Sequence, residues 1–321
     1  MFLTHLHYEE SVFIFNPNGL PAELFKDCHV AMVQRLSSQE NYKAIQLFKQ
    51  LKMKIIYDLD DDLWSVPIYN PAYKLMKTWL PGFEICANLS DAITVSTAHL
   101  KVMVARTLGK KAPPIYVVEN AIDTRLYRPL AQSLRKNKKG KVIVGWAGTN
   151  THSGDVKKVF AIIPQLLDEL PEMEFELVGE KMPEDWQRFG NRVRQRDFVP
   201  VSEFPVSWAS WQWDLSLAPL ESNAFNLSKS NLKALEAAAV KIPCVMSDIG
   251  EYGKFCSESP LLRKNVLADK PNSWKQKITS LVKDAELRRQ VGEEMYRVAV
   301  EKYEIKGRMK QWTEIFREVA A

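Results

Sequence analysis

Short apolar runs alternate with amphipathic stretches along nearly the whole chain. The apolar runs, rich in Val, Ile, Leu and Phe, occur at residues 11–15, 29–33, 54–57, 91–97, 115–118, 141–148, 175–179, 214–220 and 242–247. Between them apolar residues recur every three or four positions, as in 42–51, 156–170, 274–282, 285–302 and 307–319. Short buried strands that alternate with amphipathic helices are typical of parallel sheets covered by helices. The pattern therefore predicts an α/β fold.

Proline and glycine mark where this pattern is expected to break. Residues 16–19 (Asn-Pro-Asn-Gly) should form a turn after the first strand. Residues 70–90 have a helical pattern, but Pro81-Gly82 lies in the middle, so we expect an interruption there. Residues 156–170 read as one helix, and 266–267 as a last short strand.

A basic, polar segment at residues 130–140 separates two runs of alternating strands and helices. We interpret it as a linker between two doubly wound domains, residues 1–133 and 134–304. A nucleic-acid-binding tail is the alternative, but the segment has no aromatic residues. The last helix, within residues 305–321, carries apolar side chains at helical spacing. It is apolar enough to pack against a domain surface.

The composition fits a globular protein with a sizeable core, since 46% of the 321 residues are hydrophobic and 26% are charged. The formal net charge of +5 suits an anionic ligand, a membrane surface or nucleic acid. The four cysteines have no CxxC spacing and the five histidines form no metal motif, so we expect reduced thiols in a cytoplasmic protein. No apolar run approaches the ~20 residues of a membrane span, and no secretory signal is expected at the N-terminus; peripheral membrane contact stays open.

A strand, a polar loop and a helix follow one another at residues 214–240. Ser228 or Ser230 is the expected N-cap of the helix. The first N–H groups of a helix lack backbone partners and face outward, so the helix start binds anions well. Lys229 and Lys233 bracket this first turn. The segment predicts a phosphate site, although a plain crossover with two solvated lysines gives the same pattern.

Four aspartates occur within the five residues 58–62, directly after a buried strand. The carboxyl ends of parallel strands are where open α/β sheets bind ligands. Clustered carboxylates also suit Mg²⁺ or Mn²⁺, and aspartates often only cap helices. We expect this loop, and Asp60 above all, to bind substrate rather than a metal.

Residues 141–148 lead into a second loop of small residues, with Gly145, Gly148 and Thr149. Glycines there would let the backbone approach a phosphate closely. Further along, Trp208, Trp211 and Trp213 could stack on sugars, but tryptophans are usually well buried, so core packing is favoured.

The helix region resembles the donor-site signature of glycosyltransferases with the GT-B fold, most closely the retaining family 4 type. The matching residues are Asn226, Lys229, Ser230, Lys233, Leu235 and Glu236, followed by an apolar run, a proline and Ser-Asp. Residues 120–123 (Asn-Ala-Ile-Asp) are similar to the segment that closes the first domain in that family. The chain departs from the family at Ser228, where many members have a first glutamate, and at Ala121, where glycine is usual.

The resemblance implies two Rossmann-like domains that face each other across a cleft. The first would hold the acceptor and the second a nucleotide-diphosphate sugar, and the helix at 305–321 would pack back on the first. The implied activity is transfer of the sugar to a hydroxyl of a glycan or another acceptor, with retention at the anomeric carbon.

The resemblance also implies roles for individual residues. Lys229 would neutralise the leaving diphosphate, Glu236 would hold the ribose, and Asp60 would serve the acceptor or the donor sugar; these are the three expected catalytic residues. No metal is needed, and no cofactor besides the donor. The expected donor-binding residues are Gly148, Thr149, Phe198, Val199, Asn226, Ser230, Asn231, Leu232 and Lys233.

Three alternatives stay open from the sequence. The basic charge permits a glycosyltransferase acting on a hydroxymethylated pyrimidine of DNA, with nucleic acid as the acceptor. A sugar-nucleotide epimerase of the same fold would need more acid and base groups than the pattern supplies. The serine at position 228 permits a non-catalytic sugar-nucleotide-binding protein.

Overall fold

The structure, a computed structural model, describes all residues except 1–27, 38, 128–139 and 201–202. The strand expected at 11–15, the turn at 16–19 and most of the linker therefore lie outside the described residues. The chain folds into two compact units. The first comprises the chain up to Val66, Tyr73–Glu119 and Ile305–Ala321, and the second comprises Pro67–Ala72 and Asn120–Glu304.

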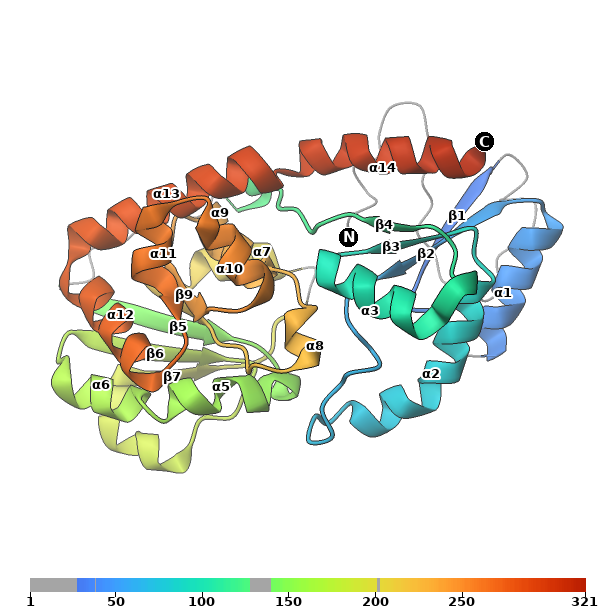
Figure 1. Cartoon of the computed structure of the whole chain (residues 1–321). Coiled ribbons are helices and arrows are strands. Elements are labelled where there is room, and N and C mark those ends of the chain that lie inside the picture. Colours follow the sequence, from blue (N-terminus) through green and yellow to red (C-terminus); the bar gives the residue numbers. More distant parts are fainter. Residues whose placement is uncertain (1–27, 38, 128–139, 201–202) are drawn as a thin grey trace. The chain divides into compact units, whose positions relative to one another are not determined.

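The first unit is built on four parallel strands in the order β1-β2-β3-β4. They are β1 Val30–Gln34, β2 Lys54–Leu59, β3 Ala92–Val95 and β4 Ile115–Val117. The helices α1 Gln39–Gln50, α2 Tyr73–Asn88 and α3 Ala98–Leu108 and the short η3 Gly109–Lys111 lie between them in the chain. Residues such as Ile45, Ile55 and Phe83 form its core. The predicted alternation of strand and helix is confirmed here (Figure 1).

Helix α2 runs without a break through Pro81, so the expected interruption at Pro81-Gly82 was wrong. The proline removes one backbone hydrogen bond. The second half of the helix is anchored by buried Phe83, Cys86 and Ala87. A Cβ on Gly82 would lie 1.8 Å from the carbonyl oxygen of Ser37, so the glycine permits a close backbone approach rather than a break.

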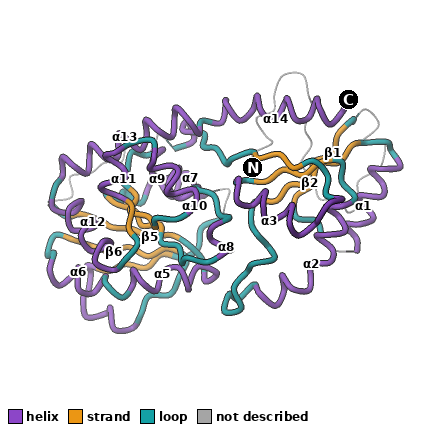
Figure 2. Tube along the Cα trace, viewed as in Figure 1, coloured by secondary structure: helices purple, strands orange, loops and turns teal. Residues whose placement is uncertain are grey.

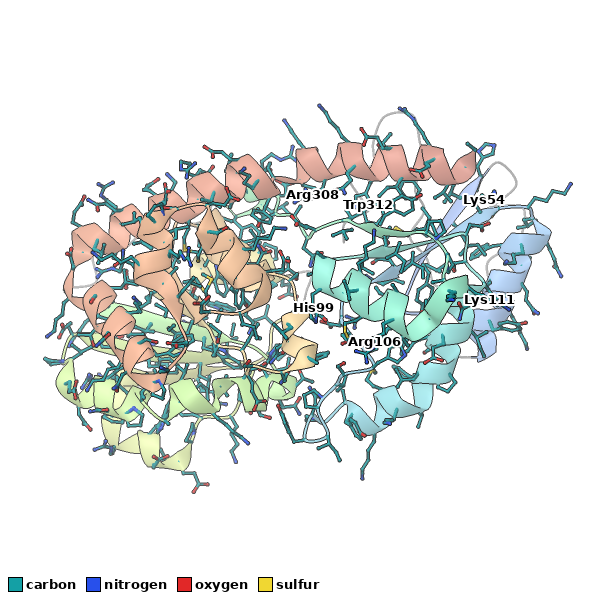
Figure 3. All side chains as sticks on the ribbon, in the orientation of Figure 1. Lys54, His99, Arg106, Lys111, Arg308 and Trp312 are labelled. Carbon is teal, nitrogen blue, oxygen red and sulfur yellow. The ribbon has the colours of Figure 1, made fainter. Side chains whose placement is uncertain are left out.

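The C-terminal helix α14 Ile305–Ala320 belongs to the first unit. Ile315 packs in a small buried cluster with Ile56, Ala92 and Val118, with Trp312 against it. Figure 3 marks Trp312 and Arg308 on this helix; the Arg308 guanidinium pairs with the Glu119 carboxylate at 2.7 Å. Tertiary packing of its apolar face thus fixes the helix.

The second unit contains six parallel strands in the order β10-β9-β8-β5-β6-β7. They are β5 Val142–Ala147, β6 Met173–Val178, β7 Val193–Arg196, β8 Leu215–Ala218, β9 Cys244–Ser247 and β10 Leu267–Ala268. The chain builds outward from β5 through β6 to β7, and then returns to place β8 on the other side of β5. The strand order therefore reverses between β5 and β8, which makes this a doubly wound sheet.

Helices precede, connect and follow these strands, drawn in purple beside the orange strands in Figure 2. They are η4 Thr124–Leu126, η5 Asn150–His152, α5 Ser153–Phe160, α6 Ile163–Glu169, η6 Glu184–Arg192, α7 Phe204–Ser210, α8 Ala224–Leu227, α9 Leu232–Ala239, α10 Gly250–Ser257, α11 Pro260–Val266, α12 Pro271–Lys283 and α13 Ala285–Tyr303. The single helix expected at 156–170 is in fact two, α5 and α6. Pro164 lies in the first turn of α6, where a missing N–H costs nothing.

Residues 120–127, which the sequence analysis placed in the first domain, group with the second unit. The backbone N–H of Ile122 donates to the carbonyl of Tyr303 at 2.9 Å. Ile122 and Tyr127 are buried in the large core of the second unit.

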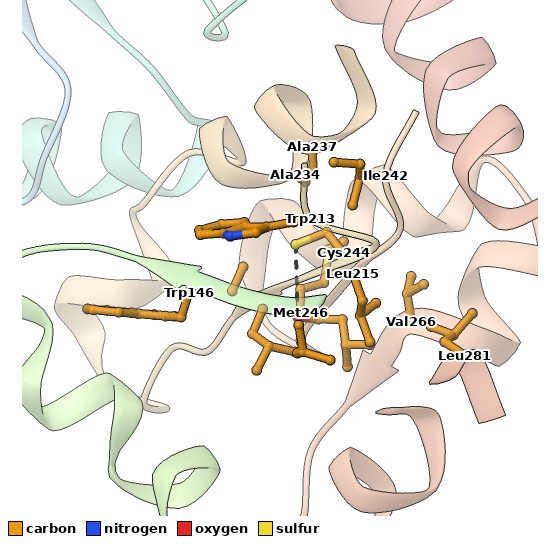
Figure 4. Close-up of a cluster of buried hydrophobic side chains, with 14 of the residues drawn as sticks. Trp146, Trp213, Leu215, Ala234, Ala237, Ile242, Cys244, Met246, Val266 and Leu281 are labelled. Atoms are coloured by element: carbon orange, nitrogen blue, oxygen red, sulfur yellow. Dashed lines mark hydrogen bonds between the residues drawn. The ribbon is translucent and has the colours of Figure 1, made fainter. Parts of the chain in front are cut away.

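Tryptophans dominate one part of that core. Trp208, Trp211 and Trp213 are each only 4% exposed and touch one another ring to ring, so the core interpretation of these three residues is confirmed. Figure 4 shows Trp146 and Trp213 among the buried side chains around β5, β8 and β9. A Cβ on Gly145 would lie 2.0 Å from the Trp213 ring. Gly145 is therefore required for core packing, and the idea that it gives a phosphate access to the backbone was wrong.

Among the described residues, no helix combines the length and hydropathy that a membrane span requires.

Candidate functional site

The reversal of strand order in the second unit brings two loops together. Strands β5 and β8 are neighbours, with Gly145 paired to Ser216. The loop after β5 leads to η5 and α5, and the loop after β8 leads to α8 and α9. Because parallel strands end at the same edge, the two loops meet at the point where the order reverses, and open α/β sheets bind ligands in that position.

On the β8 side, two short helices replace the single one expected from the sequence. The unexpected α8 is capped by Asn223, whose side-chain oxygen accepts from the Asn226 N–H at 2.8 Å. The N-cap of α9 is Asn231, so the expectation of a serine cap was wrong. Ser228 is fully buried, and the Ser230 hydroxyl accepts from the amide of Asn120 at 2.8 Å. The Ser228 hydroxyl donates to the carbonyl of Ala224 at 3.5 Å, whereas the contact of Ser230 with Asn120 joins positions far apart in the sequence.

The start of α9 leaves hydrogen-bond donors without partners. No described residue accepts a hydrogen bond from the backbone N–H of Leu232 or Lys233, and the Asn231 side chain makes no capping bond. The side-chain nitrogen of Asn231 is also buried without an acceptor among the described residues. These donors form the kind of helix terminus that binds an anion.

Two lysines add positive charge to this helix start. The ammonium of Lys233 donates to the carbonyl of Ala147 at 2.8 Å and lies 4.9 Å from the centre of the Trp146 ring. The ammonium of Lys229 lies 4.7 Å from the centre of the Phe225 ring. Aromatic faces stabilise cations. In these contacts the two ammonium groups are therefore held by aromatic rings and a carbonyl rather than by carboxylates.

Burial shifts the protonation of two groups on α9. It lowers the pKa of Lys233 to about 8, assisted by the positive charge of Lys229. It raises the pKa of Glu236 to about 7, although Lys233 opposes the rise. A bound anion would favour the charged form of Lys233. Perturbed groups of this kind gather at functional sites.

On the β5 side lies a hydrogen-bonded network that the sequence analysis did not single out. His152 Nδ1 lies 2.9 Å from Asp155 Oδ2. The other oxygen, Asp155 Oδ1, accepts from the Asn226 amide at 2.6 Å and from the Glu221 N–H at 2.9 Å. The network therefore ties the loop after β5 to the loop after β8. The spacing His-x-x-Asp after a buried strand was the one local signal for it.

The same network has unusual protonation. Lys233 is the largest cause that lowers the pKa of His152, to about 4, followed by burial. Burial by itself would raise the pKa of Asp155, but hydrogen bonds from His152 and Glu221 outweigh it and the pKa lies below its usual value. His152 is therefore neutral and Asp155 ionised at neutral pH.

The remaining donor-site predictions fall around this edge. A Cβ on Gly148 would lie 2.5 Å from the Trp146 ring and 3.2 Å from the Lys233 ammonium, so this glycine makes room for its neighbours. The Thr149 hydroxyl bonds that of Thr151 at 2.8 Å. Phe198 is 61% exposed, whereas Val199 packs against the core.

The acidic loop belongs to the first unit, and two of its four aspartates form ion pairs. The guanidinium of Arg35 forms ion pairs with both Asp60 and Asp61, the second at 2.8 Å. Burial and the neighbouring Asp61 raise the pKa of Asp60, which Arg35 opposes. Asp62 is buried, and its Oδ1 accepts from the N–H groups of Trp64 and Ser65 at 3.2 and 3.3 Å. No described helix begins at Asp62, so it caps a turn rather than a helix, and its Oδ2 is buried without a partner among the described residues.

Asp58 differs from the other three aspartates. It stands opposite Gln34 on β1 and Thr94 on β3 in the sheet register. The Thr94 hydroxyl donates to it at 2.6 Å and the Gln34 amide at 2.8 Å. Burial raises its pKa to about 6. Within the described residues, no three His, Cys, Asp or Glu side chains are grouped so as to hold a metal ion.

Comparisons with known proteins agree with this arrangement. Residues 161–314 match the family described as glycosyl transferase-like. The sequence matches no curated protein.

The whole chain is similar to solved structures at low sequence identity. Sucrose-phosphate synthase from Thermosynechococcus elongatus superposes with a TM-score of 0.67 at 16% identity, over 93% of this chain and 77% of that one. Anabaena HepE, solved with UDP and glucose, gives 0.63 at 14%, over 92% and 79%. A UDP-forming trehalose-phosphate synthase from Burkholderia xenovorans gives 0.63 at 12%, over 91% and 74%.

The family match covers most of the second unit, where the helix start and its lysines lie. The structural likeness covers more than nine-tenths of the chain and shows the fold. The chain therefore has the GT-B fold, and residues 161–314 match the glycosyl transferase-like family.

Proposed function

We propose that this enzyme transfers a sugar from a nucleoside-diphosphate sugar to an acceptor hydroxyl, with retention at the anomeric carbon. The observation that carries the proposal is the start of α9, which lies at the reversal of strand order. There the N–H groups of Leu232 and Lys233 have no acceptor among the described residues, and the ammonium groups of two lysines are nearby. Such a set fits an anionic group such as a diphosphate.

In this proposal the second unit binds the donor. Lys229 and the N–H groups at the start of α9 stabilise the charge that grows on the diphosphate as the bond from the anomeric carbon to the phosphate oxygen breaks. Glu236, one turn further along α9, accepts hydrogen bonds from the ribose hydroxyls. Exposed Phe198 offers a face for the nucleobase.

The acceptor oxygen forms the new bond to the anomeric carbon on the face that the diphosphate leaves. Its proton passes to the departing phosphate oxygen, so atoms and charges balance without a strong side-chain base. Since lysine and helix N–H groups neutralise the diphosphate, we propose that the reaction needs no metal and no cofactor. Four free cysteines, three of them buried, favour a reducing compartment such as the cytoplasm.

The first unit would bind the acceptor, with Asp60 in contact with the acceptor or the donor sugar. A glycan or other sugar hydroxyl is the proposed acceptor, because two of the three neighbours are named as synthases of sugar phosphates. None of the three is named for a nucleic acid acceptor.

A thermal-stability screen tests the donor assignment. UDP, GDP and ADP are each compared with their glucose or mannose conjugates, since a ligand that binds only the folded state raises its apparent stability. UDP and UDP-glucose are the first pair, because HepE was solved with UDP and glucose. At least one pair should stabilise the wild type and stabilise Glu236→Ala less at the same ligand concentration. If none of the six compounds stabilises the wild type, the donor assignment is refuted.

A further inference from the structure

The polar network on the β5 side has more hydrogen-bond acceptors than donors. Asn226 Nδ2 donates to Asp155 Oδ1 at 2.6 Å and to the carbonyl of Glu221 at 2.9 Å. Both partners are acceptors, so the amide orientation is fixed. Asn226 Oδ1 is then left buried without a donor among the described residues. A buried acceptor without a donor is costly and calls for a partner that supplies one.

The same reasoning fixes the imidazole of His152. Asp155 is ionised, so its oxygen can only accept, and Nδ1 of His152 must carry the proton that lies between them. The ring is neutral, which makes Nε2 an acceptor. No described residue donates to Nε2, and the side chain is 19% exposed.

The loop that carries His152 is also held from its other side. The amide of Asn70 donates to the carbonyl of Thr151 at 3.1 Å. Gly154 lies against the Tyr69 ring, where a Cβ would approach within 2.6 Å, and the Tyr69 hydroxyl bonds Glu221. These contacts lie within the second unit and support the loop on both sides of His152, whose imidazole is oriented by Asp155.

We propose that Nε2 of His152, oriented by Asp155 and Asn226, accepts a hydrogen bond from a hydroxyl of the donor sugar. His152 is thus a donor-sugar-binding residue, with Asp155 and Asn226 as its positioning residues. The inference rests on the proposed function and deepens it, because it assigns the sugar, not the diphosphate, to this side of the site.

The chemistry of the groups separates the two roles. The charged groups that face His152 are Lys233, Lys229 and Asp155. Phosphate oxygens only accept hydrogen bonds, so they bind the ammonium groups and the helix N–H groups and are repelled by a lone pair on Nε2. A sugar hydroxyl has the proton that Nε2 lacks. A site with two lysines and one neutral histidine can therefore bind both halves of a nucleotide sugar in different places.

Two substitutions at one position test the assignment by calorimetry with UDP and UDP-glucose, or with the pair that binds in the stability screen. His152→Asn keeps a donor at the position of Nδ1 for Asp155 but has no acceptor at the position of Nε2. His152→Gln can place an amide oxygen near the position of Nε2. We expect His152→Asn to weaken UDP-glucose binding about 3- to 10-fold, the range for one neutral hydrogen bond, and to leave UDP binding unchanged. His152→Gln should recover part of the loss.

Single-deoxy analogues of the donor sugar sharpen the result. For the wild type, the analogue that lacks the bound hydroxyl should bind more weakly than UDP-glucose. For His152→Asn, the same analogue and UDP-glucose should bind equally well, because the variant cannot form this hydrogen bond with either ligand.

Equal weakening of UDP and UDP-glucose would show that His152 serves the diphosphate and would overturn the inference. Wild-type affinity of His152→Asn for both compounds would reduce the histidine to a structural partner of Asp155 and would also overturn it. If neither nucleotide nor nucleotide sugar binds the wild type, the proposed function itself fails, which is a different outcome.

Discussion

In each unit of this protein, polar side chains lie at the carboxyl ends of parallel strands, but the two groups differ in which hydrogen-bonding atoms have no partner. In the first unit Asp60 and Asp61 share the guanidinium of Arg35, and Asp58 accepts from Gln34 and Thr94. Of the four aspartates, only Asp62 has a buried oxygen, Oδ2, without a partner among the described residues. In the second unit free N–H groups start α9, and Nε2 of His152 has no donor among the described residues.

The difference lies in the strand order. The second sheet reverses its order between β5 and β8, so two loops leave the same edge in opposite directions. The described strands of the first sheet follow the order of the chain without a reversal. We therefore regard a dense run of charged residues in the sequence as a weaker sign of a ligand site than polar groups that lack hydrogen-bond partners in the folded structure.

The largest effect should follow the loss of a cation in the second unit. Lys229→Ala should lower kcat on the order of 100-fold and change KM less, since the ammonium acts mainly on the charge of the transition state. Steady-state kinetics with the identified donor measure it. Lys275→Ala is the matched control, because Lys275 is a lysine of α12 that pairs with Glu169 at 2.7 Å. Wild-type turnover in Lys229→Ala would make this lysine an ordinary surface charge.

Glu236 gives the next effect, on binding. Glu236→Ala should weaken UDP-glucose about tenfold or more, as expected for hydrogen bonds to a charged group. Because the pKa of Glu236 is about 7 and the ionised form accepts better, the Kd of the wild type should fall as pH rises from 6 to 7.5. UDP-glucose suits this window, since its diphosphate has no terminal phosphate group to titrate.

Glu236→Gln is the control for the pH effect. It keeps the shape of the side chain and should give a Kd that is flat over this range. Measurements stop at pH 7.5 because Lys233 loses its proton near pH 8, which acts in the opposite direction. A pH-dependent Kd in Glu236→Gln, equal to that of the wild type, would assign the titration to another group.

In the first unit, Asp60→Asn should lower transfer about tenfold and leave the Kd of UDP-glucose within twofold, because the donor groups lie in the second unit. Chelators should have little effect. Transfer and binding assays with and without EDTA measure this. Full activity in Asp60→Asn would show that Asp60 has no role in transfer and serves only in its ion pair with Arg35. Activity that is lost in EDTA and restored by Mn²⁺ would favour a metal site.

Arg35→Leu serves as a companion variant. It should lower the apparent Tm by a few degrees, since the guanidinium is 38% exposed and screening by water limits the loss. Its donor affinity should stay that of the wild type.

The smallest effect concerns the pH dependence of stability, which has opposite signs in the two units. The pKa of Asp58 is raised to about 6, so the folded state binds its proton more tightly and stability falls as pH rises from about 4 to 6. The pKa of His152 is lowered to about 4, so the unfolded state binds its proton more tightly and stability rises over the same range and up to about 6.5.

Thermal unfolding between pH 4 and 6 separates the two contributions. Asp58→Asn should make the slope of apparent Tm against pH more positive, and His152→Gln should make it more negative, by a few degrees over the range. Slopes that move in the same direction in both variants would contradict the assignment.

The sequence by itself determined the alternation of strands and helices, because strand and helix periodicities are local properties. It also determined that a polar segment with two lysines and a helix follow β8, and that Trp208, Trp211 and Trp213 belong to the core. The resemblance to GT-B enzymes, read from the residues of that helix, agrees with the fold of the whole chain.

Only the tertiary structure decided which polar groups meet. Arg35 reaches Asp60, and Asn226 reaches Asp155 across 71 positions of sequence, because strand order brings their loops together. The tertiary structure also places the Trp213 ring against Gly145. It makes Asn231 the N-cap of α9, and it lets α2 continue through Pro81. Periodicity tells which face of an element is buried, but not which element lies against that face, so the identity of each partner is settled only when the sheet is assembled.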